Sequence, residues 1–215
     1  MKQLFQILSN GKTIIDEVPT PQLLDGQVLI NTSRTLISSG TEKMLVDFSK
    51  SSLIEKARQQ PENVKRTIEK VKSDGIATTL SAVKSKMSEP LAMGYCNVGN
   101  VIESNILGVE SGDRVVSNGN HSEIVRAPKN LIAKIPNNVD DDTAAFTVIG
   151  SIALQGIRLL NPTLGETIVV QGLGLVGLMA VQILKANGCN VIGVDLNKVR
   201  CELAKDYGAD AINLS

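Results

Sequence analysis

The sequence is poor in aromatic residues and in the side chains that bind metals. Its 215 residues include no Trp, two Tyr, three Phe, one His and three Cys. So few aromatic rings argue against a nucleic-acid-binding surface, because such surfaces stack bases on aromatic side chains. The cysteines Cys96, Cys189 and Cys201 are odd in number and lack metal-ligand spacing. This pattern favours reduced thiols in a cytoplasmic protein.

Long apolar runs and an excess of either charge are also missing. No apolar run approaches the roughly 20 residues that a membrane-spanning helix needs. The first residues have no long apolar core and no small-residue cleavage site, so they do not predict a signal peptide. The 22 basic and 22 acidic residues give a formal net charge of zero. We therefore expect a small-molecule substrate as partner, and neither a membrane nor nucleic acid.

The most informative segment lies between Thr167 and Asp195. The apolar run Ile168–Val170 predicts a buried strand and leads directly into a glycine-rich turn. An apolar helix and a second apolar run follow, and Asp195 ends the second run. This order is typical of a dinucleotide-binding βαβ unit. The alternative interpretation is a glycine-rich turn in an unrelated α/β protein.

Each part of this segment has an expected role. Gly172 allows the tight turn, Gly174 lets the backbone approach a pyrophosphate, and Gly177 lets the helix pack on the strand. The helix N-terminus offers free N–H groups to the phosphates. Asp195 is placed to accept the hydroxyls of a ribose, and its charge would repel a 2′-phosphate. The segment therefore predicts NAD as cofactor in preference to NADP, and the predicted cofactor-binding turn comprises Gly172, Leu173, Gly174, Leu175, Val176 and Gly177.

The rest of the chain divides into β-rich and helical parts. Residues 1–43 and 94–136 contain short β-rich runs separated by Gly, Asn and Pro, which indicates a small barrel or sandwich. Between them, apolar residues recur at helical spacing in a predicted insertion over residues 51–88. The insertion forms a lid over the substrate, a docking surface for another domain, or a solvated decoration. A further helix is expected over residues 143–160.

Only three strands of the expected parallel sheet are present. The third one, Ala211–Leu214, is followed directly by Ser215. A complete doubly wound sheet has about six strands, with the first near its centre. Ile168–Val170 would therefore lie at a raw edge, which is a pairing hazard. We expect the polypeptide to continue beyond Ser215, or the edge to pair with a second copy in a homo-oligomer.

Three motifs outside the glycine turn are each similar to a motif of one and the same protein superfamily. Ser39–Glu42 is similar to Cys-Gly-Thr-Asp, Gly94–Gly99 to Gly-His-Glu-x-x-Gly, and Gly112–Val115 matches Gly-Asp-Arg-Val. With the glycine turn they make the chain resemble the medium-chain dehydrogenase/reductase superfamily, which includes the zinc-type alcohol dehydrogenases. The resemblance implies an α/β protein: a GroES-like β-rich domain over residues 1–145, then the first half of a Rossmann NAD-binding domain over residues 146–215.

Within that superfamily the chain is most similar to a zinc-less bacterial branch. In this branch the medium-chain half is fused to a second half of the glucose–fructose-oxidoreductase type. The resemblance rests on the insertion, on Tyr95 and Cys96 in place of His and Glu, and on the run from Gly150 to Gly177. It implies that this chain is the front of a longer oxidoreductase.

The positions that carry metal ligands in zinc-dependent relatives hold other residues here. By the resemblance, the Cys position is Ser39, the His position is Tyr95, the neighbouring Glu position is Cys96, and a later ligand position is Thr147. Hydroxyl groups are poor ligands for a borderline-soft cation such as zinc. Three cysteines are also too few for the four-cysteine lobe of many relatives. We therefore predict no zinc and no other metal ligands.

Zinc-type alcohol dehydrogenases transfer a hydride to or from the carbon of a substrate carbonyl group. Without zinc, another group has to polarise that carbonyl and move a proton. Tyr95 is a candidate proton donor, although an aromatic ring packed on the wall of the site explains it equally well. Ser39 and His121 are further catalytic candidates, and a surface or turn-capping role is the alternative for His121. Cys96 is interpreted as a small buried hydrophobe, and Glu42 as a residue that orients its turn.

The resemblance also assigns two residues to the cofactor. Ser151 falls where relatives place a hydroxyl beside the nicotinamide ring. Arg200, five residues after Asp195, matches a basic position near the adenosine ribose, and a solvated helix face is its alternative. Together these features predict a zinc-independent, NAD-dependent oxidoreductase that passes hydride to or from a small alcohol or carbonyl compound, with a sugar-related substrate suggested by the fused relatives. The competing hypothesis is a non-catalytic dinucleotide-binding or scaffolding module.

Overall fold

The chain forms two compact units, Met1–Ile132 and Ala133–Ser215, which are described separately. The structure is a computed structural model that describes residues 1–215, except for the side chain of Leu53. The domain boundary expected from the sequence lies after residue 145. The short helix α5 (Asp141–Ala144) precedes that boundary and belongs to the second unit.

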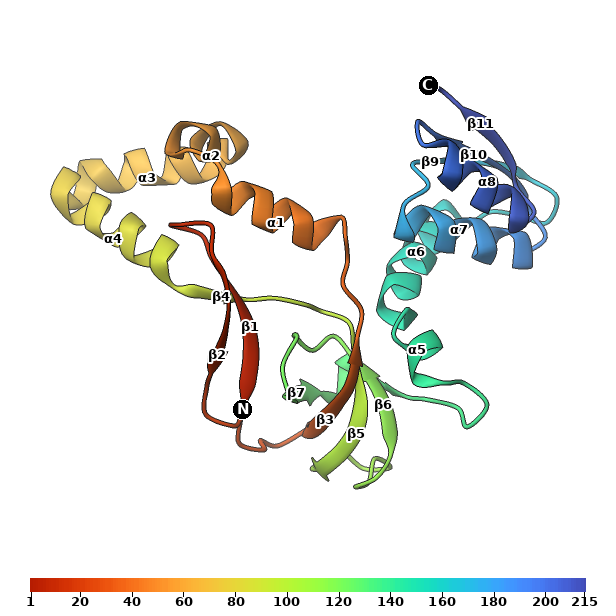
Figure 1. Ribbon diagram of the computed structural model, residues 1–215, viewed down its shortest axis with the longest axis horizontal. Helices are drawn as coiled ribbons and strands as arrows, with labels where there is room; N and C mark the ends of the chain where they lie inside the picture. Colours follow the sequence, from red (N-terminus) through yellow and green to blue (C-terminus); the bar gives the residue numbers. More distant parts are fainter. The chain divides into compact units, whose positions relative to one another are not determined.

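The first unit contains two β-sheets (Figure 1). One has the strand order β2-β1-β4, with bounds β1 (Lys2–Ile7), β2 (Thr13–Glu17) and β4 (Pro90–Ala92). The other has the order β7-β3-β5-β6-β8, with bounds β3 (Gln27–Thr35), β5 (Asn97–Ser104), β6 (Arg114–Ser117), β7 (Ile124–Pro128) and β8 (Ile132–Lys134). All of these strands except β4 lie in the β-rich ranges that the sequence predicts, and they confirm the GroES-like fold.

Alternate residues of the larger sheet form the core of this unit. They are Val28, Ile30, Val101, Val115, Val125 and Ala127, each at most 5% exposed. Full burial of such a valine or isoleucine side chain contributes about 1.5–3 kcal/mol. The central pair, β3 and β5, is antiparallel with two register irregularities. This core is therefore a rigid base for the loops at the strand ends.

The segment before β7 joins the smaller sheet through the backbone of His121. The His121 carbonyl accepts a hydrogen bond from the Leu4 N–H at 2.9 Å, and the His121 N–H donates to the Met93 carbonyl at 2.7 Å. A short 3-10 turn, Lys129–Leu131, follows β7. These two backbone bonds fix the single histidine between β1 and the residues that follow β4.

The helical segment begins earlier than the sequence predicts. Its helices are α1 (Thr41–Lys50), α2 (Leu53–Gln59), α3 (Pro61–Asp74) and α4 (Ile76–Ser88). The sequence reading placed the start of the insertion at residue 51 and missed α1. The signals were present, because Glu42 in the first turn and Lys50 in the last turn both complement the helix dipole.

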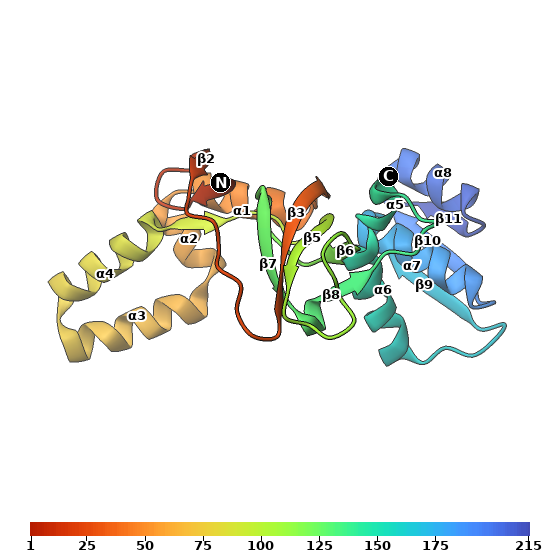
Figure 2. The ribbon, with the colours of Figure 1, turned by 90° about the horizontal axis from the view of Figure 1, so that it is seen from below.

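Local sequence signals define the next two helices. Ser52 and Glu55 form a reciprocal capping box at the start of α2, and Pro61 opens α3. Lys56 ties α2 to the rest of the unit, since its Nζ donates to the carbonyls of Leu8 at 2.6 Å and Ser49 at 2.8 Å. Beyond this anchor α3 has no buried residue. Figure 2 shows α3 and α4 as a helical pair that extends from the sheets.

The second unit is a parallel α/β layer. Its elements are α6 (Thr147–Leu160), β9 (Thr167–Gln171), α7 (Leu175–Ala186), β10 (Asn190–Asp195), α8 (Lys198–Asp206) and β11 (Asp210–Asn213). The strand order is β11-β10-β9, with both pairings parallel. The predicted Rossmann-type βαβ unit is thereby confirmed.

The core of the second unit lies between the sheet and its helices. Leu173, Val181 and Leu184 are at most 1% exposed, and Val191 is 2% exposed. Within this sheet β9 pairs with β10 alone. Its outward side chain Val169 is 61% exposed. The first strand is therefore an edge strand in the part of the chain that the structure describes.

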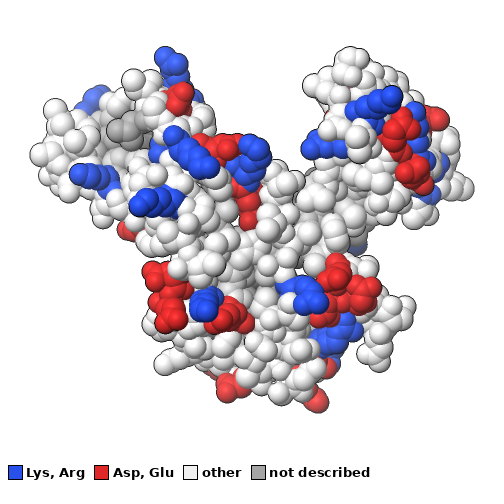
Figure 3. Space-filling view, viewed as in Figure 1, with Lys and Arg blue, Asp and Glu red and all other residues white. Residues whose placement is uncertain are grey.

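Two surface properties bear on partners. Among the described residues, no helix combines the length and apolar character needed to cross a membrane. On the face shown in Figure 3, acidic and basic side chains are interspersed over both units. This mixed pattern agrees with the zero net charge of the sequence.

Candidate functional site

The glycine turn of the second unit has three glycines with three different constraints. Gly172 has φ +88°, which side chains rarely adopt. A Cβ on Gly177 would lie 1.9 Å from the Gly172 carbonyl oxygen, so only glycine allows α7 to pack this closely on the turn. A Cβ on Gly174 would meet nothing within 4 Å. The space above Gly174 is therefore open to a ligand, as a dinucleotide-binding turn requires.

The N-terminus of α7 adds an anion-binding element to this turn. Gly174 is its N-cap residue and supplies no side chain to cap the helix. The N–H groups of Leu175, Val176 and Gly177 point along the axis toward the open side, because the first turn of a helix has no internal partners for them. With the helix dipole, they fit the pyrophosphate of a dinucleotide. The residues present thus fit the predicted cofactor.

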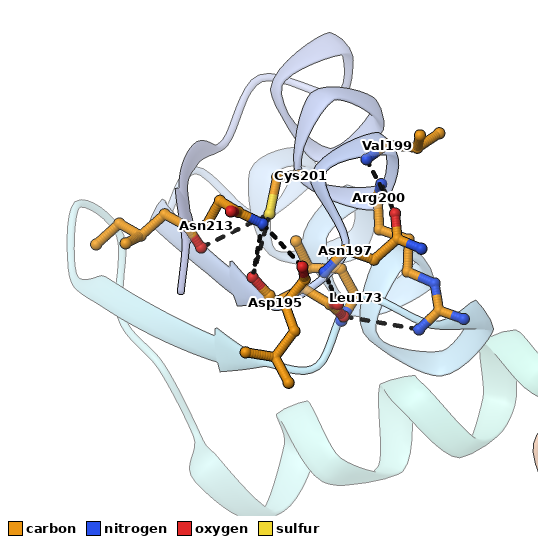
Figure 4. A network of polar contacts seen from close by, with 9 residues as sticks. Leu173, Asp195, Asn197, Val199, Arg200, Cys201 and Asn213 are labelled. Atoms are coloured by element: carbon orange, nitrogen blue, oxygen red, sulfur yellow. Dashed lines mark hydrogen bonds and ion pairs between the residues drawn. The ribbon is translucent and has the colours of Figure 1, made fainter. Parts of the chain in front are cut away.

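Asp195 lies at the end of β10 and holds this turn in place. Its Oδ2 accepts the Leu173 N–H at 2.7 Å, and its Oδ1 accepts the Asn197 N–H at 2.7 Å (Figure 4). Arg200 Nη1 is 3.8 Å from Oδ2. The N–H groups of Asn197 and Leu173, and then the charge of Arg200, lower the pKa of the Asp195 carboxyl below its ordinary value. The carboxylate is ionised and 10% exposed, so it presents its charge beside the turn.

Contacts join Leu173, Asp195 and Arg200 beside the glycine turn, whereas the cofactor role of Ser151 stays a prediction. The side chain of Leu173 is fully buried and its N–H is bound to Asp195, so this residue supports the turn from inside. Ser151 is exposed on α6, where its hydroxyl donates to the Val148 carbonyl at 2.7 Å. That bond is local to the helix and leaves the Ser151 oxygen with accepting capacity.

The polar centre of the first unit is a buried pair, Glu42 and His121. His121 Nε2 is 2.8 Å from Glu42 Oε2, and the two side chains are 10% and 7% exposed, respectively. The other oxygen, Oε1, accepts the Ser38 N–H at 2.8 Å. Glu42 therefore does orient its turn, as the sequence suggests. It also binds the only histidine, 79 positions away, which sequence reasoning did not foresee.

The remaining candidates of this unit take separate positions. Cys96 is fully buried, and burial, with a smaller contribution from the negative charge of Glu42, raises the pKa of its thiol to about 11. Tyr95 is half-buried, and no hydrogen bond joins it to His121 within the described residues. Ser39 lines a groove of about 370 Å³ beside α1, whereas His121 lines a different groove of about 470 Å³.

At the positions that carry zinc ligands in the resembled family, Ser39 and Tyr95 present hydroxyl groups and Cys96 presents a fully buried thiol. Among the described residues, no three His, Cys, Asp or Glu side chains gather in a way that would hold a metal. Glu42 and His121 bind each other.

Parts of the chain are similar to known dehydrogenases. Residues 176–215 match the family described as Zinc-binding dehydrogenase. An alcohol dehydrogenase of Geobacillus stearothermophilus is 37% identical over 97 residues, which are 44% of this chain and 29% of that protein. An L-threonine 3-dehydrogenase of Francisella philomiragia is 28% identical over 209 residues, 95% of this chain and 59% of that protein.

Solved structures show the same fold. The alcohol dehydrogenase rspB of Escherichia coli CFT073 superposes with a TM-score of 0.73 at 23% identity, covering 100% of this chain and 63% of that one. The mycobacterial protein Rv1454c superposes with a TM-score of 0.68 at 22% identity, covering 100% of this chain and 58% of that one. In each of these comparisons, this chain spans less than two thirds of the relative or solved structure that it matches.

Proposed function

We propose that the chain belongs to a dehydrogenase or reductase of the alcohol dehydrogenase type, which transfers hydride between a nicotinamide cofactor and an alcohol or sugar-like substrate. The observation that carries this proposal is the turn Gly172–Gly177, in which Gly174 leaves open space in front of an uncapped helix N-terminus. Hydride transfer is the usual use of a bound nicotinamide. The alcohol and L-threonine 3-dehydrogenases to which the chain is similar support the substrate class.

We further propose NAD(H) as the preferred cofactor. The ionised Asp195 beside the turn would repel a 2′-phosphate, although Arg200 lies 3.8 Å away and offsets part of that charge. Solved neighbours do not decide the choice, since the rspB structure contains NADH and the Rv1454c structure contains NADPH. The experiment therefore has to test whether the negative charge of Asp195 or the positive charge of Arg200 has the larger effect on a 2′-phosphate.

The proposal includes independence from zinc, because the candidate ligands Ser39 and Tyr95 are hydroxyls and Cys96 is a buried thiol. We also propose that the edge of β9, which is unpaired in the described sheet, is covered in the working protein. A second oxidoreductase half of a longer polypeptide would cover it, or a second copy of the chain would pair with it. The competing function, a dinucleotide-binding module without chemistry, is favoured by the same loss of metal ligands.

Calorimetric titration with NADH and NADPH tests the cofactor proposal. We expect NADH to bind at least about tenfold more tightly, a difference of about 1.4 kcal/mol. In Asp195→Ala the ratio of the two affinities should narrow, whereas Asp206→Ala, which removes an exposed carboxylate from α8, should preserve it. Tighter NADPH binding by the unaltered protein would contradict the proposal.

The same protein, prepared without a histidine tag, serves to test whether zinc is bound and whether the protein catalyses hydride transfer. Metal analysis should find far less than one zinc per chain. Incubation with NAD and a panel of secondary alcohols and methyl glycosides should produce reduced nicotinamide absorbance. Tight NADH binding without turnover of any compound in either direction would favour the non-catalytic module.

A further inference from the structure

His121 is one of the residues that line the groove of about 470 Å³ in the first unit. It is bounded by β1, β2 and the end of β3, and both polar and apolar side chains line it, among them Thr32, Ser122, Leu4 and Ile37. A mixed lining of this kind suits a small molecule that has an apolar body and a few hydroxyl groups. Of the Glu42–His121 pair, His121 is the member that lines this groove.

The bond to Glu42 determines which imidazole nitrogen is basic. An ionised carboxylate only accepts hydrogen bonds, so Nε2 of a neutral His121 has to carry the proton that lies between Nε2 and Glu42 Oε2. The lone pair then resides on Nδ1. In the described part of the chain, the only buried side-chain nitrogen or oxygen without a partner is Gln27 Oε1. Nδ1 has no protein partner, and it is therefore accessible rather than buried.

The position of this imidazole is set by the backbone around it. The N–H and carbonyl of His121 are both bonded, to Met93 and Leu4. The ring lies directly over Gly94, where a Cβ would come within 2.7 Å of the imidazole Cγ and Cδ2. Gly94 also has φ +90°. The ring is thus held before any ligand arrives, as a group that acts on a substrate needs to be.

Thr32 supplies a second oriented group in the same groove. Its Oγ1 accepts a hydrogen bond from Asn97 Nδ2 at 2.8 Å, and the buried Asn97 in turn accepts one from Ser117 Oγ at 3.1 Å. This chain of bonds occupies an acceptor site of Thr32 and leaves its O–H proton to donate. The groove therefore offers one acceptor, His121 Nδ1, and one donor, the Thr32 hydroxyl.

The ionisable groups that face His121 come from several elements. Glu42 approaches from α1, Cys96 lies in the segment before β5, and Lys2 and Glu123 line the mouth of the groove. Glu123 Oε2 accepts the Lys2 backbone N–H at 2.8 Å. Only Glu42 is bonded to the imidazole. A substitution of Glu42 should therefore change the protonation of the His121 imidazole more than a substitution of Lys2 or Glu123.

We propose that Glu42 and His121 form the proton-transfer site of this protein, and that the adjoining groove binds a small polyhydroxyl compound whose reacting oxygen lies between His121 Nδ1 and the Thr32 hydroxyl. In the oxidation of an alcohol, the O–H bond would break and its proton would move to Nδ1, and a C=O bond would form as the carbon gives up a hydride. A bound nicotinamide would supply the two-electron acceptor for that hydride. Reduction reverses both transfers. The inference rests on the proposed function for its hydride acceptor. His121 is the catalytic residue and Glu42 is its positioning residue.

The single histidine makes this proposal directly observable. In a long-range ¹H–¹⁵N spectrum of the full chain, we expect one imidazole, protonated at Nε2 at neutral pH. Addition of methyl α-D-glucopyranoside as probe should shift the Nδ1 resonance. Glu42→Gln should weaken the preference for the Nε2–H tautomer, Glu42→Asp should retain more of it, and Asp47→Asn, an exposed carboxylate on the same helix, should change nothing. The proposal would be overturned if the neutral imidazole carried its proton on Nδ1. It would also be overturned if the Nδ1 resonance did not shift on addition of this probe or of 2,3-butanediol.

Kinetics provide the second arm. His121→Gln should lower turnover about 10²–10⁴-fold, the usual contribution of a general acid or base, while its NADH affinity should stay within about twofold, because the glycine turn and Asp195 are unchanged in this variant. Full turnover by a folded His121→Gln would refute the role of the imidazole. If the unaltered protein binds no NADH, the proposed function fails. The spectra would then still decide whether the pair and its groove bind a hydroxyl compound.

Discussion

The two polar centres of this protein are built in different ways. The cofactor turn of the second unit is made of backbone: two glycines without room or freedom for a side chain, and a third that leaves open space. The Glu42–His121 centre of the first unit is made of side chains that meet across 79 positions of sequence. The first kind of site depends on local chain geometry, and the second depends on the packing of several elements around it.

This difference separates binding from chemistry. Backbone N–H groups at a helix N-terminus recognise a phosphate whatever the neighbouring side chains are, so a turn of this kind serves many activities. A buried carboxylate bound to an imidazole serves a narrower task, because it fixes one tautomer and leaves one nitrogen basic. The comparison therefore predicts that changes in the turn affect cofactor affinity and stability, whereas changes in the side-chain centre affect turnover.

The largest effect is expected in the turn itself. Gly177→Ala places a Cβ 1.9 Å from the Gly172 carbonyl oxygen, and overpacking of this kind costs about 1–3 kcal/mol. Gly174→Ala meets no atom within 4 Å, so its stability should be near that of the unaltered protein. Both variants should lose NADH affinity, the first because the turn is displaced and the second because the methyl group occupies the space of the pyrophosphate.

Urea unfolding and calorimetry of the two variants measure these effects side by side. The comparison is sharpened if only Gly177→Ala lowers the unfolding midpoint while both weaken NADH binding. Equal stability of the two variants would show that α7 can move away from Gly172 at little cost, and the backbone-built description of the turn would then be wrong.

The same contrast explains what the sequence could predict. Gly172, Gly174, Gly177 and Asp195 were found from their spacing, because each role depends on a few neighbouring residues. The bond between Asp195 and the Leu173 N–H was not foreseen. It joins two strand ends, and only the parallel register of β9 and β10 places them together.

The contact between Glu42 and His121 could not be predicted from the sequence at all. A single sequence gives no signal that a residue in the first turn of α1 meets one in the segment before β7. The assignment of residues up to about 43 to strands also hid the helix that carries Glu42. The burial of Cys96 was predicted, whereas the charge of Glu42 near its thiol was not.

A medium effect is expected at alkaline pH through Cys96. Its folded pKa of about 11 exceeds the ordinary value of 9.0, so the unfolded chain loses the thiol proton first. The folded state therefore loses stability progressively as pH rises above about 9, by up to about 2 kcal/mol near pH 11, at 1.36 kcal/mol for each pKa unit. Cys96→Ala should decline less over this range than the unaltered protein, when both are followed by urea unfolding.

Val98→Ala is the matched control, because it shortens a fully buried side chain of the same unit that has no ionisable group. Its alkaline decline should parallel that of the unaltered protein. If Cys96→Ala and Val98→Ala respond alike, the Cys96 thiol does not contribute to the pH dependence of stability and this part of the comparison fails.

The smallest effect is expected at acid pH, in the one side chain on which the cofactor turn depends. The N–H groups of Asn197 and Leu173 hold the pKa of Asp195 below its ordinary value of 3.8. A depressed pKa means that the carboxylate stabilises the fold above about pH 4, and that this contribution disappears as pH falls through the folded pKa. Asp195→Asn should therefore unfold at lower urea than the unaltered protein at about pH 7, and the gap should close as pH falls through the lowered folded pKa of Asp195, below which both side chains are neutral. Asp206→Asn, an exposed carboxylate on α8, should show no such gap. A gap that persists unchanged at acid pH would show that the ionisation of Asp195 does not stabilise the fold, and that Asp195 supports the turn through shape and hydrogen-bond geometry alone.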